Sequence, residues 1–301
     1  MRKFLLGLSV LAIVAAACAP EDETPAEPAE GSAREAPVDA ASCATAAGTV
    51  NDGVLTVGTG NPAFPPWWEG GTTDEHDEWE FNDPYLLEGF EGATVGAVAE
   101  QLGFAPDAIE FVPVPFNKSF APGPKDFDFV LQQISYSDKR AQAVDFSESY
   151  YDVNQALVSV KGSDIEGATT LAELQGATLG APLGTTSFDY IEQNIQPTEE
   201  PKVFNDLNGA VQALKNGQVD GIVVDLPTAF FVTAVQIPKG VIVGQFPTVG
   251  AQEYFALALE QDSAMTECLD LALQALKDDG TLAAIQQEWL ADNASAPVIE
   301  G

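Results

Sequence analysis

The sequence predicts an α/β protein with largely parallel sheets. Short apolar runs typical of buried strands alternate along the chain with segments that have the apolar periodicity of helices. The runs interpreted as strands are 54–59, 109–114, 127–134, 153–160, 178–181, 221–224, 242–246 and 255–259. The segments interpreted as helices are 94–102, short stretches beginning near 171 and 186, 207–216, 265–277 and 282–290. Alternation of this kind is the pattern of βα units, whose strands lie parallel.

Several of these helices carry recognisable end signals. Thr170 and Glu173 have the spacing of a capping box, in which each side chain accepts a hydrogen bond from the backbone of the other residue. Gly103 and Gly217 each follow the last periodic residue of a helix. Asp279-Gly280 separates the final two helices. These signals support the order of elements given above.

The first 17 residues have the layout of a secretory signal peptide. Arg2 and Lys3 precede an apolar run over 4–14, which is too short to span a bilayer as a permanent helix. Small residues then lead directly to Cys18, an arrangement similar to a bacterial lipobox. We therefore expect Cys18 to become the lipidated first residue of the mature protein. The alternative is ordinary cleavage near Ala17, with Cys18 unmodified.

Residues 18–52 are interpreted as a disordered, acidic and proline-rich tether. The stretch 21–41 has almost no large apolar residues and cannot bury a core. The folded part then begins near Cys43 or Val54 and has roughly 240 residues, enough for two lobes of ordinary size. No later run is long and apolar enough to predict a transmembrane helix.

The charge balance bears on the partners of the protein. The chain has 46 acidic and 12 basic residues and a formal net charge of −34. Such a surface repels polyanions, which argues against nucleic acid as a partner. The charge alone says nothing about a small ligand.

The chain contains three cysteines. If Cys18 carries lipid, Cys43 and Cys268 remain as a pair. An even remainder outside the cytoplasm predicts a disulfide between them. The alternative is two unpaired thiols.

The inventory of side chains argues against metal enzymes. His76 is the only histidine, so a His-rich metal site cannot form. It lies in the acidic stretch 74–79, which we interpret as a solvated loop. A calcium loop is the alternative, although the spacing of the acids is not that of a known one. The sequence predicts no metal site.

A second feature imitates a cofactor site. Residues 58–63 match the dinucleotide fingerprint G-x-G-x-x-A, which needs a helix to begin there. Pro62, Pro65 and Pro66 are incompatible with a continuous helix. No nicotinamide or other cofactor is therefore predicted.

The residues that do carry a signal fit the capture of an amino acid. A guanidinium can fork onto an α-carboxylate, hydroxyls and backbone N–H groups can complete its shell, and a carboxylate can face the α-ammonium. Aromatic rings then cover the apolar part. The candidates follow predicted strands: Ser135, Arg140, Thr185, Thr186, Asp225, Phe64, Trp67, Trp68 and Phe116. Ligands of open α/β sheets bind beyond the carboxyl ends of strands, which agrees with this placement.

Four motifs in order resemble the family 3 extracellular solute-binding proteins of ABC importers. They are Arg140-Ala-Gln-Ala-Val-Asp-Phe-Ser147 with Tyr150-Tyr151, Gly184-Thr-Thr186, Ala213-Leu-Lys-Asn-Gly-Gln-Val-Asp-Gly221 with Val224-Asp225, and Leu276-Lys-Asp-Asp-Gly-Thr-Leu282 ending in Glu288-Trp289. The resemblance runs from about Val54 to Leu290. One of these motifs alone is weak, whereas four in order are specific.

The resemblance implies a two-lobe, type II periplasmic-binding-protein-like fold with two crossover strands. Lobe I would comprise 53–152 and 248–292, lobe II 153–247, and 293–301 would form a C-terminal tail. The crossings are expected near 151–158 and 245–254. The implied function is the extracytoplasmic capture of a polar amino acid, or a similar small molecule, by lobe closure. A monomer anchored to the membrane by its lipid would then deliver the ligand to a membrane permease.

By motif position, Arg140 would hold the α-carboxylate with help from Thr185 or Thr186. Ser135 and Asp225 would take the α-ammonium. Phe64 and Trp67 fall where the family has a stacking aromatic residue near the mouth of the pocket.

Each site residue also has a structural alternative. Arg140 alone would more often form a surface ion pair, while Asp225, Thr185 and Thr186 could be helix caps. Trp67 and Trp68 could be core residues, and we expect one of them to be core and the other to face the ligand.

The chain departs from the family pattern at several positions. Gln132 and Gln133 replace small residues, Gly60 is an extra residue in the first loop, and Asn117 and Lys118 replace acidic or small ones. Because Gln133 is bulky, we expect it in the side-chain pocket, and the identity of the ligand stays open.

An enzyme and a sensor lobe are the alternatives to a binding protein. A minority of relatives are dehydratases of small cyclic acids, and Glu69 or Glu91 could be proposed as the acid, but their spacing favours neither. A sensor or surface-interaction lobe would usually come with a spanning helix and a cytoplasmic domain. We therefore expect no enzymatic activity.

Overall fold

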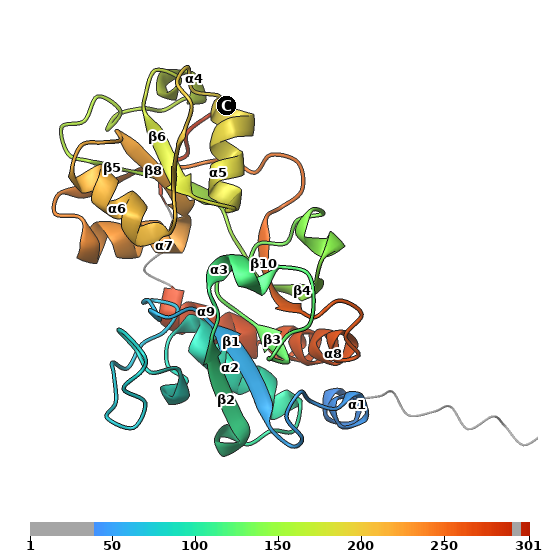
Figure 1. The fold of residues 1–301 in the computed structure, drawn as a ribbon. Helices are drawn as coiled ribbons and strands as arrows, with labels where there is room; N and C mark the ends of the chain where they lie inside the picture. Colours follow the sequence, from blue (N-terminus) through green and yellow to red (C-terminus); the bar gives the residue numbers. More distant parts are fainter. Residues whose placement is uncertain (1–38, 291–295) are drawn as a thin grey trace, which may run out of the picture. The chain divides into compact units, whose positions relative to one another are not determined.

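The computed structural model describes residues 39–290 and 296–301, which belong to one compact unit. The signal peptide, Cys18 and the predicted tether up to residue 38 lie outside the described residues. Two five-stranded sheets organise the described chain, each with its own helices (Figure 1).

The first sheet has the strand order β2-β1-β3-β10-β4. Strand β1 pairs in parallel with β2 and β3, and β10 runs antiparallel to β3 and β4. The strands are β1 (Leu55–Thr59), β2 (Ile109–Pro113), β3 (Phe129–Val130), β4 (Asp145–Asp152) and β10 (Tyr254–Leu259). Helices α1 (Ala40–Ala47), α2 (Phe90–Gln101), α8 (Met265–Asp278) and α9 (Thr281–Leu290) share a hydrophobic core with this sheet.

The second sheet has the strand order β7-β6-β8-β5-β9. Strands β6, β7 and β8 are parallel, whereas β5 runs antiparallel to both β8 and β9. The strands are β5 (Gln155–Val160), β6 (Leu179–Pro182), β7 (Lys202–Phe204), β8 (Gly221–Asp225) and β9 (Gly240–Gln245). Helices α4 (Leu171–Leu174), α5 (Thr186–Tyr190), α6 (Leu207–Lys215) and α7 (Leu226–Phe231) accompany it.

Shorter helical segments complete the described chain. Helix α3 (Phe116–Ser119) follows β2, and three 3₁₀ turns cover Pro84–Leu86, Pro106–Ala108 and Arg140–Gln142. Two π-helical turns, Ile191–Ile195 and Val232–Gln236, extend α5 and α7. The predicted capping box of Thr170 and Glu173 is present at the start of α4.

The chain changes sheets between β4 and β5 and again between β9 and β10. Its C-terminal segment also pairs with the second sheet. Ile299 donates from its backbone N–H to Gln245 O at 2.9 Å, and Gln245 N–H donates to Pro297 O at 2.7 Å. The Ile299 side chain is 1% exposed in a core that includes Leu157 and Leu174. The predicted tail is therefore packed structure at residues 296–301.

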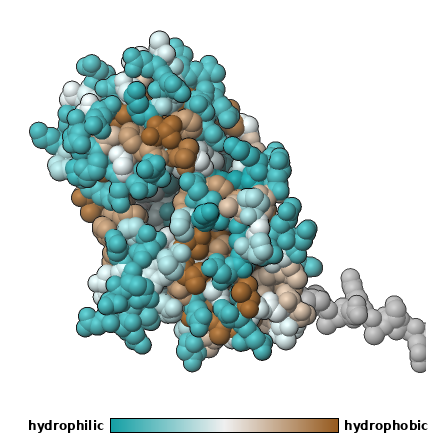
Figure 2. Space-filling view, viewed as in Figure 1, coloured by the Kyte–Doolittle hydropathy of each residue, from teal (hydrophilic) through white to brown (hydrophobic). Residues whose placement is uncertain are grey.

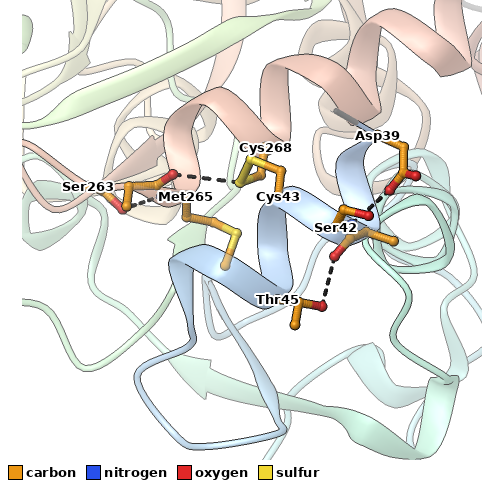
Figure 3. Close-up of a disulfide and its surroundings, with 9 residues drawn as sticks. Asp39, Ser42, Cys43, Thr45, Ser263, Met265 and Cys268 are labelled. Carbon is orange, nitrogen blue, oxygen red and sulfur yellow. Dashed lines mark hydrogen bonds between the residues drawn. A yellow bond between two sulfur atoms is a disulfide. The ribbon is translucent and has the colours of Figure 1, made fainter. Parts of the chain in front are cut away.

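The predicted tether extends too far toward the C-terminus, because α1 begins at Ala40. The Asp39 side chain caps this helix by accepting from Ser42 N–H at 2.7 Å. Cys43, on α1, is bonded to Cys268, on α8, with an S–S distance of 2.05 Å (Figure 3). Small residues can form this helix without large apolar side chains, because α1 packs its alanines closely against the core.

The surface agrees with the acidic composition. Hydrophilic residues cover most of the face shown in Figure 2, with scattered apolar residues between them. Among the described residues, no helix has both the length and the apolar character needed to cross a membrane.

Candidate ligand-binding site

A cavity of about 450 Å³ is lined by residues that follow or end strands of both sheets. Thr59 ends β1 and Gln132 follows β3 in the first sheet, whereas Pro182 ends β6 and Asp225 ends β8 in the second. Because these ends belong to parallel strands, polar loop residues converge there without disturbing either core. The cavity is thus built at the edge that α/β sheets use for ligands.

Arg140 is a buried cation in the wall of this cavity. It is 7% exposed and opens the 3₁₀ turn that follows Ser135. One guanidinium nitrogen donates to Ser135 O at 2.5 Å and the other to Gly184 O at 2.8 Å. The guanidinium carbon lies 4.2 Å from the centre of the Phe120 ring, a cation–π distance.

No carboxylate among the described residues forms an ion pair with Arg140. Burial lowers the pKa of Arg140 to about 10, although the charges of Glu253 and Asp189 act in the opposite direction. At neutral pH the side chain is therefore a buried positive charge. Its remaining N–H groups are available to an anion.

Three hydroxyls stand near Arg140. Thr185 caps α5 by accepting from Phe188 N–H at 3.2 Å, and its own hydroxyl donates to Pro182 O at 2.8 Å. The Thr186 hydroxyl lies 3.3 Å from that of Ser135. Thr185 is therefore already engaged as a cap, while Thr186 is the hydroxyl closer to the residues of the first sheet.

Two residues that the sequence analysis missed connect this region. Glu253 accepts from Ser135 Oγ at 2.7 Å and from Gln155 Nε2 at 3.1 Å. Gln155 in turn accepts from Ser187 Oγ at 2.6 Å. Gln155 lines the main cavity, whereas Glu253 lines a smaller neighbouring one. Both lie where the chain changes sheets, and no sequence motif marks them.

Asp225 is both a helix cap and a lining residue of the cavity. Its side chain accepts from Thr228 N–H at 2.9 Å and so caps α7, and it also lines the cavity. Burial raises its pKa to about 6, although the hydrogen bonds from Thr228 lower it. Among the described residues it forms no ion pair. The cap engages one carboxylate oxygen, and no cation among the described residues pairs with the other.

Phe64 and Phe116 line the cavity, but the structure differs from the prediction at Trp67. Trp68 is the tryptophan in the lining, and Trp67 packs edge-on against Phe90 and Phe255 in the core. The Trp67 indole N–H lies 3.4 Å from the Thr228 hydroxyl. The sequence could not choose between adjacent aromatics, because the choice depends on the rings that surround each of them.

Gln133 lines the cavity from a left-handed backbone conformation with φ of 54°. Glu91 holds it in place by accepting from its backbone N–H at 2.8 Å and from its Nε2 at 2.5 Å. The Tyr150 hydroxyl also donates to Glu91, at 2.5 Å. Glu91 is fully buried, and burial raises its pKa to about 7 despite these donors.

The acids considered for catalysis do not reach the cavity. Glu91 lies behind Gln133, and neither it nor Glu69 is part of the lining. His76 contacts Asp83 at 2.9 Å and stacks on Tyr85, away from the lining residues. Within residues 39–290 and 296–301, no group of three or more histidines, cysteines or acids is placed to hold a metal ion.

Two α/β units joined by crossing strands, with a cavity at strand ends from both, define a two-lobe solute-binding protein of type II. The chain belongs to family 3 of the bacterial extracellular solute-binding proteins, whose model matches residues 70–292. Membership of this family places its action outside the cytoplasm.

Individual relatives agree with this assignment. The chain is 27% identical to the arginine-binding extracellular protein ArtP of Bacillus subtilis, with 73% of this chain and 84% of ArtP covered. It is 29% identical to the ABC transporter arginine-binding protein 1 of Escherichia coli, over 55% of this chain and 67% of that protein. A solved ancestral arginine-binding protein bound to arginine matches with a TM-score of 0.62 and 30% identity, covering 79% of this chain and 98% of that one.

Proposed function

We propose that this protein captures a polar α-amino acid in the cavity and delivers it to the membrane permease of an ABC importer. The relatives named for arginine binding and for an ABC transporter support the ligand class and the partner. The sequence motifs that contain Arg140, Thr185, Thr186 and Asp225 also support the capture of an amino acid.

The observation that carries the proposal is that the buried charge of Arg140 has no carboxylate partner among the residues that the structure describes. A buried guanidinium without a carboxylate partner costs free energy, and an incoming anion removes that cost. A ligand α-carboxylate matches the fork of N–H groups that the two backbone carbonyls leave free. The α-ammonium then faces Asp225.

The other lining residues complete the capture of a zwitterion. Thr186 and the N–H groups at the start of α5 add donors to the carboxylate, with Thr185 fixing that turn. Ser135 holds Arg140 in place through its backbone carbonyl, and its hydroxyl donates to Glu253. Phe64 and Phe116 cover the aliphatic part of the ligand, while Gln133 faces its side chain.

Closure of two lobes onto the ligand explains why its groups come from both sheets. We assign residues 39–152 and 248–290 to lobe I, which includes α1, and residues 153–247 with 296–301 to lobe II. Arg140 belongs to the first lobe and Asp225 to the second, so only a closed state satisfies both ends of one zwitterion. Closure then follows from the higher affinity of the ligand for that state.

The cellular setting follows from the first residues of the chain. A lipid on Cys18 would hold a monomer at the outer face of the membrane, beside its permease. Mass spectrometry of the mature protein tests this, since an unmodified residue 18 excludes the anchor.

Binding without chemical change is the activity we propose. A thermal-shift screen with the common amino acids tests it, because a ligand that binds only the native state raises the melting temperature by mass action. Stabilisation by an amino acid that is recovered unchanged supports the proposal. Turnover of the stabilising ligand would favour an enzyme, and no stabilisation by any amino acid would contradict amino-acid capture.

A further inference from the structure

We propose that the ligand side chain ends in N–H donors, because Gln132 and Gln133 present fixed carbonyl oxygens to the part of the cavity that receives it. This inference rests on the proposed amino-acid-binding function. It concerns two of the positions at which the chain departs from its family, and it predicts which amino acids the cavity accepts or rejects.

The orientation of Gln132 is set by acceptors on the protein. Its Nε2 donates to Val114 O at 3.1 Å and to Ser119 Oγ at 2.5 Å. A backbone carbonyl can only accept, so the atom facing Val114 is the amide nitrogen. Both amide hydrogens are thereby used. The Oε1 atom has no hydrogen-bond donor among the described residues.

Gly60 leaves this oxygen uncovered. A Cβ atom at position 60 would lie 2.9 Å from Gln132 Oε1, so any larger residue would press against it. Both residues line the cavity. Gly60, the extra residue in the first loop, therefore leaves room for a ligand group to reach Gln132 Oε1.

The Gln133 side-chain amide is also held by its nitrogen, here by the carboxylate of Glu91. Its backbone N–H and its Nε2 both donate to Glu91, which is buried and fixed by the Tyr150 hydroxyl. The Oε1 atom again has no donor within the described part of the chain. Above its raised pKa of about 7, Glu91 is a carboxylate that can only accept hydrogen bonds, so it holds the nitrogen of the Gln133 amide toward itself and acts as a positioning residue.

Thr59 adds a third polar group to the same region. It is fully buried, it lines the cavity, and its hydroxyl has no hydrogen-bond partner within the described residues. A buried polar atom without a partner costs free energy, which a ligand group can remove. Two acceptors and one hydroxyl suit a carboxamide, a ureido group or a guanidinium. They do not suit a carboxylate, because two carbonyl oxygens would face its negative charge.

Calorimetry at pH 8, where Glu91 is ionised, tests the preference for N–H donors on the full mature chain with five ligands: glutamine, citrulline, arginine, glutamate and methionine. We expect the three N–H donors to bind more tightly than methionine, and glutamate to bind at least about tenfold more weakly than glutamine. Equal or tighter binding of glutamate would overturn the inference and leave amino-acid capture intact. Arginine binding without citrulline binding would also overturn it, because charge rather than hydrogen bonding would be recognised. Failure of all amino acids to bind would instead contradict the proposed function.

Two variants test the residues themselves. Gln132→Met keeps the size of the side chain and removes its acceptor, so it should weaken glutamine about threefold to tenfold and leave methionine unchanged. Gln212→Met, at an exposed position of α6, is the matched control. Equal effects of Gln132→Met on glutamine and methionine would contradict a specific role for the acceptor.

Glu91→Gln tests the positioning role. The amide oxygen of the glutamine at position 91 still accepts from Tyr150 and from the Gln133 backbone, so its NH₂ group points at the Gln133 side chain. The Gln133 amide should then rotate, so that its oxygen accepts from that NH₂ group and its Nε2 points into the cavity. The preference for glutamine over glutamate should then fall about threefold or more. A residue that only supports the fold would weaken both ligands alike, and that result would overturn the positioning role.

Discussion

Replacement of Glu91 by glutamine should change how the stability of the ligand-free protein depends on pH. Glu91 is a fully buried carboxyl group, and no cation among the described residues pairs with it. Burial raises its pKa from 4.5 to about 7. Glutamine keeps the acceptor for Tyr150 and for the Gln133 backbone but cannot ionise.

The direction and size of the effect follow from proton linkage. Between pH 4.5 and 7 the folded protein keeps the proton on Glu91, while the unfolded chain has released it. The unfolding free energy therefore falls as pH rises through this window. The stabilisation that comes from protonated Glu91 is fully present only below about pH 4.5. A shift of about 2.5 units corresponds to about 3 kcal/mol.

Denaturant unfolding at pH 4.5, 6 and 8 measures this difference. The difference in unfolding free energy between Glu91→Gln and the wild type should shift in favour of the variant by up to about 3 kcal/mol as pH rises from 4.5 to 8, because only the wild type loses stability in this range. Glu192→Gln removes one negative charge from an exposed position and serves as the control for the overall acidity of the chain. The same pH profile for Glu91→Gln and wild type would refute a buried, proton-binding carboxyl at this position.

Three further results are expected. Replacing Cys43 and Cys268 by serine should lower the unfolding free energy by about 2–4 kcal/mol, because the bond joins residues 225 positions apart; denaturation unaffected by reductant would contradict this. Ile299→Ala should cost about 2–5 kcal/mol in the same assay, whereas Val298→Ala, at a 55% exposed position, should cost little; equal effects would contradict the packing of the C-terminal segment. Amino-acid affinity, followed by calorimetry from pH 7.5 to 5, should weaken below about pH 6 as Asp225 gains its proton, and a pH-independent affinity would argue against its role.

Much of the fold could be predicted because its strands are apolar and its helices periodic. Strand β4 was not expected, since its sequence DFSESYYD mixes acids with aromatics and pairs at the edge of the sheet. The predicted strand 127–134 is reduced to Phe129–Val130, because the residues that follow turn toward the cavity. In both cases neighbouring strands and loops decide what the local pattern leaves open.

The site could be predicted where motifs mark it and not elsewhere. Arg140 and Asp225 stand in recognisable stretches that end at strand edges, and both line the cavity. Glu91, Gln155 and Glu253 could not be found in this way. Each becomes relevant only through hydrogen bonds to residues at least 30 positions away, which the folded chain brings together.

Calorimetry on Arg140→Lys and Asp225→Asn tests the capture of a zwitterion most directly. Lysine keeps the charge but loses the fork, and asparagine keeps the cap of α7 while losing the charge that faces the ammonium. Each substitution should weaken the best ligand from the screen by about 2–5 kcal/mol. The controls Lys139→Arg and Asp152→Asn lie at exposed positions and should leave the affinity unchanged. Unchanged dissociation constants for both site variants would remove these residues from the site and contradict amino-acid capture.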